Sequence, residues 1–326
     1  MRYFLTGGTG FVGSYLARLL RKEGHAVVAV VRTPAKAGAL VDLGVEVVKG
    51  DVTDKESMRA PMTGCDGVFH VAGWYKLGSK HPEDGEKINV GGTMNVLELM
   101  RELGIQKGVY TSTLAINSDT HGATYDESFH YSGKHLSVYD KTKAEAHRLA
   151  LEFMKNGLPL VIVMPGLIYG PDGTGLSDEA LRNYLRKKLP MISKGSGYCW
   201  AHVEDIAMGH YLAMQKAQPG TVYIIAGPKH TMQDAFTIAQ KITGIKAPMA
   251  APAGMIKFSA RISAAVEWLI PLPELYRSET LRVSAGATYY GDNGKAKKEL
   301  DYAPRDLETG LRETLQYEWD KIKQKK

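Results

Sequence analysis

A tyrosine and a lysine four residues apart are the strongest candidates for chemistry in this sequence. They begin and end the segment YDKTK (139–143), and residues at positions i and i+4 share one face of a helix. A phenol has an unperturbed pKa of about 10, so it needs a nearby cation to exchange a proton near neutral pH. We therefore predict that Tyr139 is a general acid/base and that Lys143 lowers its pKa. An ordinary amphipathic helix can carry the same pair, so the assignment needs support from elsewhere.

Hydroxyl side chains at the end of an earlier apolar run supply the second half of such a site. The segment YTST (110–113) closes a β-rich run that begins at Gly108. Its hydroxyl groups would face the crevice at the carboxyl edge of a parallel sheet, where one of them could hydrogen-bond a substrate carbonyl. Threonine also favours strands for packing reasons, so this segment alone is equally consistent with ordinary strand composition.

A glycine-rich segment near the first residue is typical of a phosphate-binding turn. A short apolar run at 3–5 leads into TGGTGFVG (6–13), which places Gly7, Gly10 and Gly13 where a strand turns into a helix. Glycine permits the tight turn and the close approach of a pyrophosphate, and the helix N-terminus offers free N–H groups. In this context an accidental glycine-rich turn is the less favoured interpretation.

The residues after the second apolar run favour NADP over NAD. An acid commonly stands there to hydrogen-bond the adenosine ribose 2′-hydroxyl of NAD, whereas this chain has VVRT (30–33). Arg32 offers a planar cationic group to a 2′-phosphate or to the adenine ring, and Lys36 could add a second charge. A merely solvated Arg32 is the alternative, which the missing acid makes less favoured.

Two further strand ends are candidates for the cofactor site. Asp51, in GDV (50–52), could accept a hydrogen bond from the adenine amino group and could equally cap a helix that begins near Thr53, and the two roles are compatible. The segment HVAG (70–73) has small residues that let the backbone pass close to a cofactor. His70 has no partner at metal-ligand spacing, so we expect it to make structural hydrogen bonds.

The elements that position these residues alternate between strand and helix. Apolar runs at 3–5, 26–31, 45–48, 67–71 and 108–111 are separated by amphipathic segments such as 14–23, where Leu16, Leu19 and Leu20 share one face. This alternation predicts an α/β fold of Rossmann type, a doubly wound parallel sheet with right-handed crossovers. Runs at 160–164 and 222–226 continue the sheet. We expect a Rossmann domain over 1–170, a strand return near 200–228, and a smaller substrate lobe over most of 171–326.

Composition favours a soluble cytoplasmic protein. Of the 326 residues, 44% are hydrophobic and 23% are charged, and the net charge of +6 is spread along the chain, so no nucleic-acid partner is expected. The two cysteines have no metal-ligand or disulfide spacing. We find no signal peptide and no transmembrane segment. The one basic cluster is expected to be a frayed, solvated tail: Lys321, Lys323, Lys325 and Lys326.

Taken in order, eight segments resemble the extended short-chain dehydrogenase/reductases, also called the NAD-dependent epimerase/dehydratase family. They are TGGTGFVG, GDVTD, HVAG, NVGGT, YTST, YDKTK, MPGLIYGP and AHVEDIA, and they span nearly the whole chain. The VRTP segment and the short hydroxyl segment look most like dihydroflavonol-4-reductase-like and hopanoid-associated sugar epimerase-like members. The resemblance implies a Rossmann domain, a small substrate lobe, and often a homodimer built through the helices that carry the tyrosine and the lysine.

Carried over by position, the resemblance implies a catalytic triad of Thr113, Tyr139 and Lys143. Thr113 matches the catalytic hydroxyl, Tyr139 the general acid/base and Lys143 the ribose-binding lysine. Asn89 matches a residue that supports the cofactor site, and residues 165–168 match the stretch beside the nicotinamide. No metal is expected. The complete set expected at an NADP(H) site is Gly7, Thr9, Gly10, Phe11, Val12, Arg32, Lys36, Asp51, Val52, Val71, Ala72, Gly73, Asn89, Tyr139, Lys143, Pro165, Gly166 and Ile168.

Departures from the family pattern reduce the number of candidate reactions. Leu114 and Ala115 stand where sugar-nucleotide dehydratases carry an acidic pair, which disfavours elimination of water. Met164 stands where many members have arginine, which weakens the inference of an anionic sugar nucleotide. The leading hypothesis is NADPH-dependent reduction of a ketone or aldehyde, reversible as alcohol oxidation. The alternatives are a sugar-nucleotide epimerase that retains its cofactor, and a non-catalytic NADP-sensing protein on the same fold.

The substrate lobe itself has no diagnostic motif. His202 and Asp205, in AHVEDIA, are expected to tie the lobe to the Rossmann domain. Several large side chains could line a pocket, although most are expected to be core residues: Tyr184, Met191, Tyr198, Trp200, Met255, Phe258, Trp268 and Tyr276.

Overall fold

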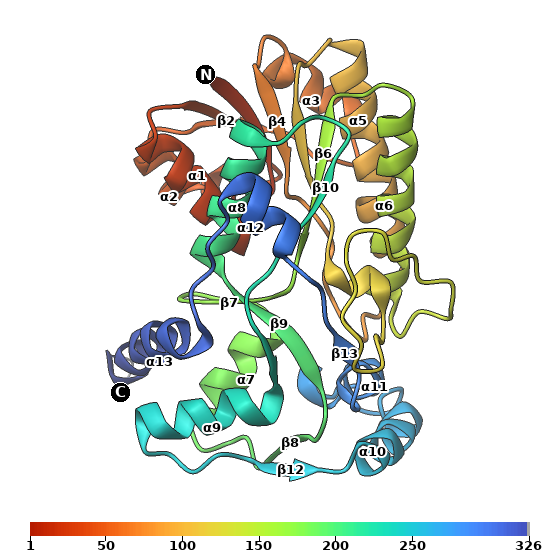
Figure 1. Cartoon of the computed structure of the whole chain (residues 1–326), viewed down its shortest axis with the longest axis vertical. Helices are drawn as coiled ribbons and strands as arrows, with labels where there is room; N and C mark the ends of the chain where they lie inside the picture. Colours follow the sequence, from red (N-terminus) through yellow and green to blue (C-terminus); the bar gives the residue numbers. More distant parts are fainter. Residues whose placement is uncertain (325–326) are drawn as a thin grey trace.

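The computed structural model describes residues 1–324, and a seven-stranded parallel sheet forms its upper layer (Figure 1). The spatial order is β10-β6-β5-β4-β1-β2-β3. The order reverses between β1 and β4, which is where a doubly wound sheet opens a crevice at the carboxyl ends of its strands. This confirms the predicted fold class. The strands are β1 (Arg2–Thr6), β2 (Ala26–Val31), β3 (Glu46–Lys49), β4 (Gly67–His70), β5 (Gly108–Thr111), β6 (Leu160–Pro165) and β10 (Val222–Ile225).

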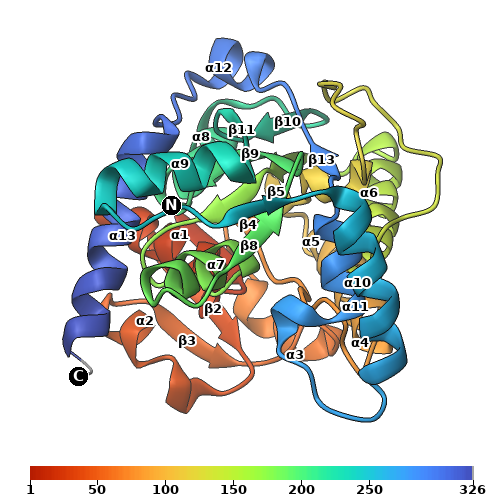
Figure 2. The ribbon, with the colours of Figure 1, turned by 90° about the horizontal axis from the view of Figure 1, so that it is seen from below.

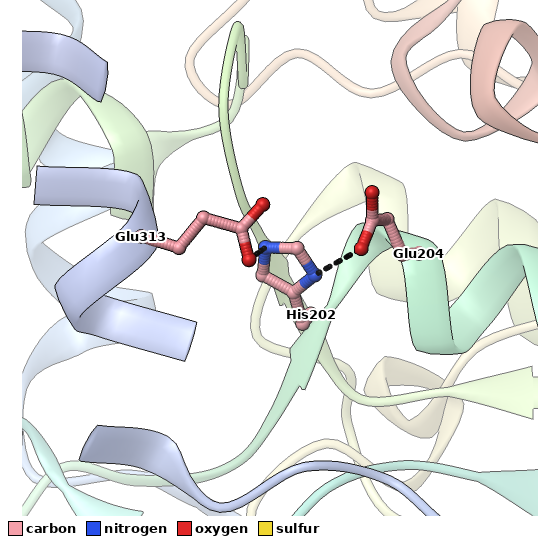
Figure 3. A group of neighbouring side chains, drawn as sticks. All are labelled: His202, Glu204 and Glu313. Atoms are coloured by element: carbon pink, nitrogen blue, oxygen red, sulfur yellow. Dashed lines mark ion pairs between the residues drawn. The ribbon is translucent and has the colours of Figure 1, made fainter. Parts of the chain in front are cut away.

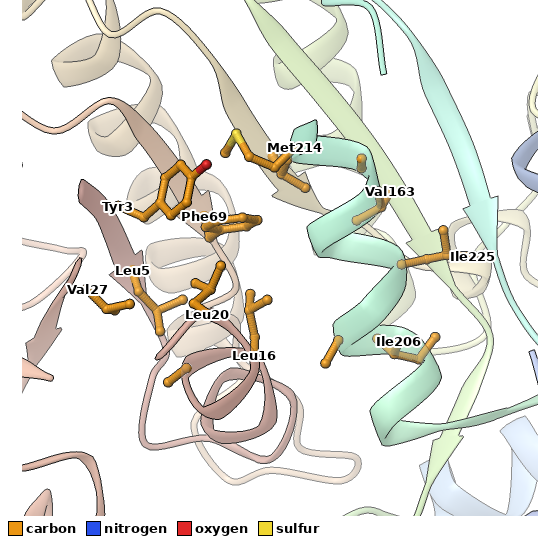
Figure 4. Close-up of a cluster of buried hydrophobic side chains, with 14 of the residues drawn as sticks. Tyr3, Leu5, Leu16, Leu20, Val27, Phe69, Val163, Ile206, Met214 and Ile225 are labelled. Carbon is orange, nitrogen blue, oxygen red and sulfur yellow. The ribbon is translucent and has the colours of Figure 1, made fainter. Parts of the chain in front are cut away.

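Helices cover both faces of this sheet because its central strands are apolar on both sides. On one face α1 packs beside α8, and Leu16, Leu20 and Ile206 are fully buried there (Figure 4). On the other face Met58 of α3 and Leu97 of α5 belong to a second core cluster that also includes α6 residues. These helices are α1 (Phe11–Lys22), α3 (Lys55–Met62), α5 (Gly92–Glu102), α6 (Val138–Lys155) and α8 (Val203–Lys216), with the short helices α2 (Gly38–Asp42) and α4 (Glu83–Gly85).

A second layer of elements lies beyond the carboxyl edge of the sheet (Figures 1 and 2). Its core contains Tyr184, Trp200, Phe236 and Leu311. The helix α12 (Gly294–Leu300) returns from this layer to pack against α8 and β10. The remaining elements are β7 (Leu167–Tyr169), α7 (Leu176–Leu185), β8 (Met191–Ser193), β9 (Gly197–His202), β11 (Lys229–Thr231), α9 (Met232–Thr243), β12 (Met249–Ala251), α10 (Ala253–Val266), α11 (Ser278–Ser284), β13 (Thr288–Tyr289) and α13 (Leu307–Gln324). Within residues 1–324 no helix has both the length and the apolar character needed to cross a membrane.

The basic residues near the last helix are more ordered than the sequence suggested. Lys321 forms an ion pair with Asp172, and the Lys323 ammonium lies 5.5 Å from the centre of the Trp319 ring. The prediction of a frayed tail is therefore wrong for these two lysines, because α13 continues to Gln324, whereas Lys323 is exposed to solvent as expected. Lys325 and Lys326 lie outside the described residues.

Candidate active site

The glycine-rich turn joins β1 to α1 and lies against the segment that follows β4. Gly7 has a φ of +75°, and a Cβ on it would be 2.7 Å from the backbone nitrogen of Ala72. A Cβ on Gly13 would be 2.1 Å from the carbonyl oxygen of Gly7. Neither position can accept a side chain without moving backbone. Thr9 and Gly10 are exposed in this turn, so the N–H groups at the start of α1 remain accessible to a phosphate.

A buried chain of side-chain hydrogen bonds fixes the end of β4 beside this turn. The Thr6 hydroxyl oxygen accepts hydrogen bonds from the backbone N–H groups of Val71, at 3.2 Å, and Ala72, at 3.1 Å. His70 joins Thr6 through Nδ1 at 2.8 Å and Thr93 through Nε2 at 3.1 Å. Burial lowers the pKa of His70 to about 3, so the ring is neutral. The expected structural role of His70 is confirmed.

Asn89 connects the loop after β4 to the helix that carries the tyrosine and the lysine. It lies in a segment of π-helix, Glu86–Gly91, and its Oδ1 accepts from the backbone N–H of Trp74 at 2.7 Å. Its Nδ2 donates to the Trp74 carbonyl at 3.1 Å and to the Thr142 hydroxyl at 2.9 Å. Because the amide is used within the protein, Asn89 is placed to support the loop rather than to contact a cofactor.

Thr113, Tyr139 and Lys143 come from two elements that meet at the carboxyl edge of the sheet. Thr113 follows β5 and starts the 3-10 turn Leu114–Asn117, and Tyr139 lies in the first turn of α6. Burial raises the pKa of Tyr139 to about 12, although the nearby Thr113 hydroxyl acts in the opposite direction. The α6 helix begins here because the Ser137 hydroxyl accepts from the Asp140 N–H at 3.0 Å and caps it.

The Lys143 ammonium is directed to the end of β5. It donates to the Thr111 carbonyl at 2.7 Å and to the Tyr110 hydroxyl at 3.2 Å. Burial lowers its pKa to about 7. The groups that act on the pKa of Tyr139 in this structure are Thr113 and Asp140. The predicted effect of Lys143 on Tyr139 therefore stays a prediction for the complex with cofactor.

One prediction for the adenine end of the cofactor site is wrong. Arg32 follows β2 directly and is exposed, as is Lys36 in the short turn Pro34–Lys36. The carboxylate of Asp51 accepts from both the N–H and the hydroxyl of Thr53, each at 2.9 Å. The prediction that Asp51 caps the following helix is wrong, because α3 begins at Lys55 and is capped by Asp54.

Residues 165–168 form the passage from the sheet to the second layer. Pro165 ends β6, and Ile168 lies in β7, which pairs in parallel with β9. A Cβ on Gly166 would lie 2.1 Å from the Cys199 carbonyl oxygen, so this close approach requires glycine. The two cysteines, Cys65 and Cys199, are both free and buried.

A buried carboxyl group beside Tyr139 was not predicted. Asp140 is only 2% exposed, its Oδ1 accepts from the Ser137 hydroxyl at 2.7 Å, and its Oδ2 has no partner among the described residues. Burial raises the pKa of Asp140 to about 7, and the nearby Glu279 carboxylate acts in the same direction. Glu279, in α11, also accepts from the Val138 N–H at 2.7 Å. Asp140 is visible inside YDKTK, but no sequence signal links Glu279 to it.

Several tyrosines lie close enough to Asp140 for its charge to act on them, and a buried amide without a partner among the described residues lies in the turn after β5. The rings of Tyr75 and Tyr139 meet edge to face at 4.8 Å, and Tyr198 stacks on Tyr289 at 5.6 Å. Burial raises the pKa of Tyr198 and Tyr289, and the Asp140 charge contributes to both shifts. Asn117 is 1% exposed, and neither its amide nitrogen nor its amide oxygen has a partner in residues 1–324. Unpaired buried polar groups are costly, so this region favours a ligand that can hydrogen-bond them.

The large side chains singled out from the substrate lobe separate into three groups. Tyr184 and Trp200 are core residues, and Tyr198 belongs to the aromatic group near Asp140. The expectation that most would be core residues is wrong, because the other five are exposed: Met191, Met255, Phe258, Trp268 and Tyr276.

His202 lies between two glutamates in an arrangement that brings three potential metal ligands together (Figure 3). Its Nδ1 is 3.9 Å from Glu204 and its Nε2 is 3.8 Å from Glu313. Arg305 already pairs with both glutamates at 2.8 Å and with Asp205 at 3.0 Å. Because the carboxylates flank opposite ring nitrogens and an arginine neutralises them, we assign the group as a structural clamp. Asp205 joins α8 to the segment before α13 through its hydrogen bonds with Arg305. Neither ring nitrogen of His202 has a hydrogen-bond partner among the described residues, so a tying role for His202 stays a prediction.

The parallel sheet, its glycine turn and the Thr-Tyr-Lys arrangement define an extended short-chain dehydrogenase/reductase. Residues 3–226 match the NAD dependent epimerase/dehydratase family, and the chain belongs to that family. It is an NAD(P)-dependent oxidoreductase of this extended type.

Several relatives match nearly the whole chain. A Synechocystis protein provisionally named as a dihydroflavonol 4-reductase is 32% identical over 97% of this chain and 94% of its own length. The 4-hydroxy-2-methyl-3-oxo-4-farnesyl-3,4-dihydroquinoline-1-oxide ketoreductase of Stigmatella aurantiaca is 31% identical over 94% and 92%. The solved UDP-glucose 4-epimerase of Thermotoga maritima has the same fold, with a TM-score of 0.79, 22% identity, and coverage of 99% and 100%.

Proposed function

We propose that this protein is an NADPH-dependent reductase of a ketone or aldehyde that also oxidises the corresponding alcohol. The observation that carries the proposal is that Thr113, Tyr139 and Lys143 all lie at the carboxyl edge of the sheet. Tyr139 and Lys143 are one turn apart on α6, and Thr113 follows the end of β5. The glycine turn between β1 and α1 lies at the same edge, where a dinucleotide binds in this class of sheet.

NADPH supplies the hydride when it is bound, and the side chains handle the proton. Tyr139 donates its phenolic proton to the carbonyl oxygen as negative charge develops there, and the Thr113 hydroxyl donates a hydrogen bond to the same oxygen. Lys143 holds the ribose hydroxyls and stabilises the tyrosinate that remains until a proton returns from solvent. Because burial raises the pKa of Tyr139 to about 12 in the free protein, loss of its proton needs a nearby positive charge, which Lys143 would supply when protonated.

Arg32 supports the preference for NADP(H). Its exposed guanidinium stands at the end of β2, where NAD-binding members need an acid, and it can bind a 2′-phosphate through two parallel hydrogen bonds. Lys36 adds a second exposed cation one short turn later. In the same proposal the substrate is a small molecule, the protein is cytoplasmic, and α6, the helix that carries Tyr139 and Lys143, forms the interface of a homodimer.

Reduction is preferred to epimerisation because the two relatives described above have names that describe reductases. The epimerase similarity concerns the fold alone, since identity to that structure is 22%. Leu114 and Ala115 also leave the catalytic threonine without the acidic pair of dehydratases. The domain roles follow: residues 1–170 with the return near 200–228 bind the cofactor, and most of 171–326 binds substrate.

The test is a titration of the purified protein with NADPH and with NADH, followed by nicotinamide fluorescence. An Arg32→Ala variant is compared with Arg312→Ala, which removes an exposed arginine from α13. We expect NADPH to bind more tightly than NADH, and only Arg32→Ala to remove the difference. A preference for NADH, or a cofactor that purifies with the protein and does not exchange, would instead favour the epimerase.

A further inference from the structure

The helix α10 exposes a continuous apolar stripe. Met255, Phe258 and Ile262 are 52%, 62% and 52% exposed, and their spacing of three and four residues places them on one face. The opposite face is buried through Ile256 and Ala260. The helix is therefore anchored on one side and presents a second apolar face to solvent.

The loop after α10 prolongs this stripe. Trp268, Leu269 and Ile270 are 76%, 63% and 53% exposed. The backbone N–H groups of Leu269 and Ile270 both bond to the Val266 carbonyl, so the chain continues turning where the helix ends. Single exposed apolar residues are ordinary, but six neighbouring ones mark an interaction site. We call these six residues the α10 surface.

The charged residues on α10 itself are both positive. Lys257 and Arg261 are both exposed and lie four residues apart, so they share the same flank of the stripe. The only acid in residues 246–273 is Glu267, and its carboxylate accepts from the Ser278 N–H at 3.0 Å and hydroxyl at 2.7 Å. An apolar stripe with a basic flank and a tryptophan at its end complements the headgroup and acyl boundary of an anionic bilayer.

The position of α10 makes such docking sterically feasible. Both ribbon views place α10 at an outer edge of the second layer, on the side opposite α13 (Figures 1 and 2). α10 packs against α11, whose Glu279 binds the N–H of Val138 beside Tyr139. α10 is therefore connected through α11 to the start of α6, the helix that carries Tyr139.

We propose that the α10 surface docks this protein peripherally on bilayers that contain anionic lipids. The apolar side chains enter the acyl boundary while Lys257 and Arg261 contact lipid phosphates. The helix lies in the plane of the interface and does not cross it. Docking does not depend on which reaction the protein catalyses, so it can fail or succeed independently of the reductase assignment.

The experiment is co-sedimentation of the full-length protein with vesicles of phosphatidylcholine, and with vesicles in which part of it is replaced by phosphatidylserine. We expect binding to the anionic vesicles that weakens as salt is added. A Phe258→Ser/Ile262→Ser variant and a Lys257→Glu/Arg261→Glu variant should each lower the partition coefficient at least about tenfold. Val41→Ser, which removes an equally exposed apolar residue from α2, should leave it unchanged.

Thermal melting of each variant checks that it remains folded, because all four substituted side chains of α10 are exposed. Equal sedimentation of all variants, or no binding to anionic vesicles, would overturn the proposal. It would also be overturned if Phe258→Ser/Ile262→Ser changes only the oligomeric state in gel filtration, since the α10 surface would then bind a second copy of the chain.

Discussion

Replacing Asp140 with asparagine should change how the stability of this protein depends on pH. The carboxyl group is 2% exposed, and burial raises its pKa to about 7 from an ordinary value near 3.8. The folded state therefore binds the proton more tightly than the unfolded state. The resulting stability is fully present below about pH 4 and is lost as pH rises through about 7.

The size of this change in stability follows from the difference between the pKa of Asp140 in the folded and in the unfolded protein. Each unit of pKa difference corresponds to about 1.4 kcal/mol, so about three units give a total of roughly 4 kcal/mol. Between about pH 5 and about pH 8.5 the wild type should lose roughly 3 kcal/mol through this group. An asparagine amide cannot ionise, and its oxygen can still accept from Ser137, so Asp140→Asn removes this loss.

The assay is urea unfolding of the wild type and of Asp140→Asn at these two pH values. The free energy of unfolding of the variant, relative to the wild type, should rise by roughly 3 kcal/mol from the lower to the higher pH. Asp42→Asn, at an exposed position at the end of α2, should show no such rise. A constant difference for Asp140→Asn would refute the inference that Asp140 is protonated near neutral pH in the folded protein.

Three other changes test the site and its support. Tyr139→Phe should lower kcat for carbonyl reduction about 100-fold or more while NADPH still binds, because it removes the proton donor. Steady-state kinetics measure kcat, and the fluorescence titration measures NADPH binding. An unchanged kcat would show that Tyr139 is not the proton donor. Gly13→Ala should abolish dinucleotide binding, since the added Cβ would meet the Gly7 carbonyl oxygen at 2.1 Å; tight binding measured by the same titration would contradict a rigid turn. Arg305→Met should lower the free energy of unfolding by about 2 kcal/mol in urea, because the acids around His202 lose their counterion; an equal or higher stability would show that the clamp is dispensable.

The sequence alone was sufficient for the parts of this protein that depend on local pattern. Strand and helix periodicity predicted the sheet, including its later strands at 160–164 and 222–226, because burial on both faces demands apolar runs. The glycines of the first turn were recognisable because their conformations exclude other residues. Helical spacing likewise placed Tyr139 and Lys143 on one face of α6.

Local pattern failed where several chemically equivalent positions competed. The sequence suggested Asp51 as the cap of the helix after β3, whereas in the folded backbone Asp54 caps α3. The same limit applied to large apolar side chains, since Tyr184 is buried in the core while Phe258 faces solvent. The type of a residue does not determine whether other parts of the fold bury it.

Tertiary structure decided which distant residues share an environment. Glu279 reaches the first turn of α6 from α11, and together with burial it raises the pKa of Asp140. The lysine that was expected to tune Tyr139 bonds to Thr111 and Tyr110 at the end of β5. The pKa of a buried group depends on how close other atoms and charges lie in space. Those distances are set by packing between elements that are far apart in the sequence.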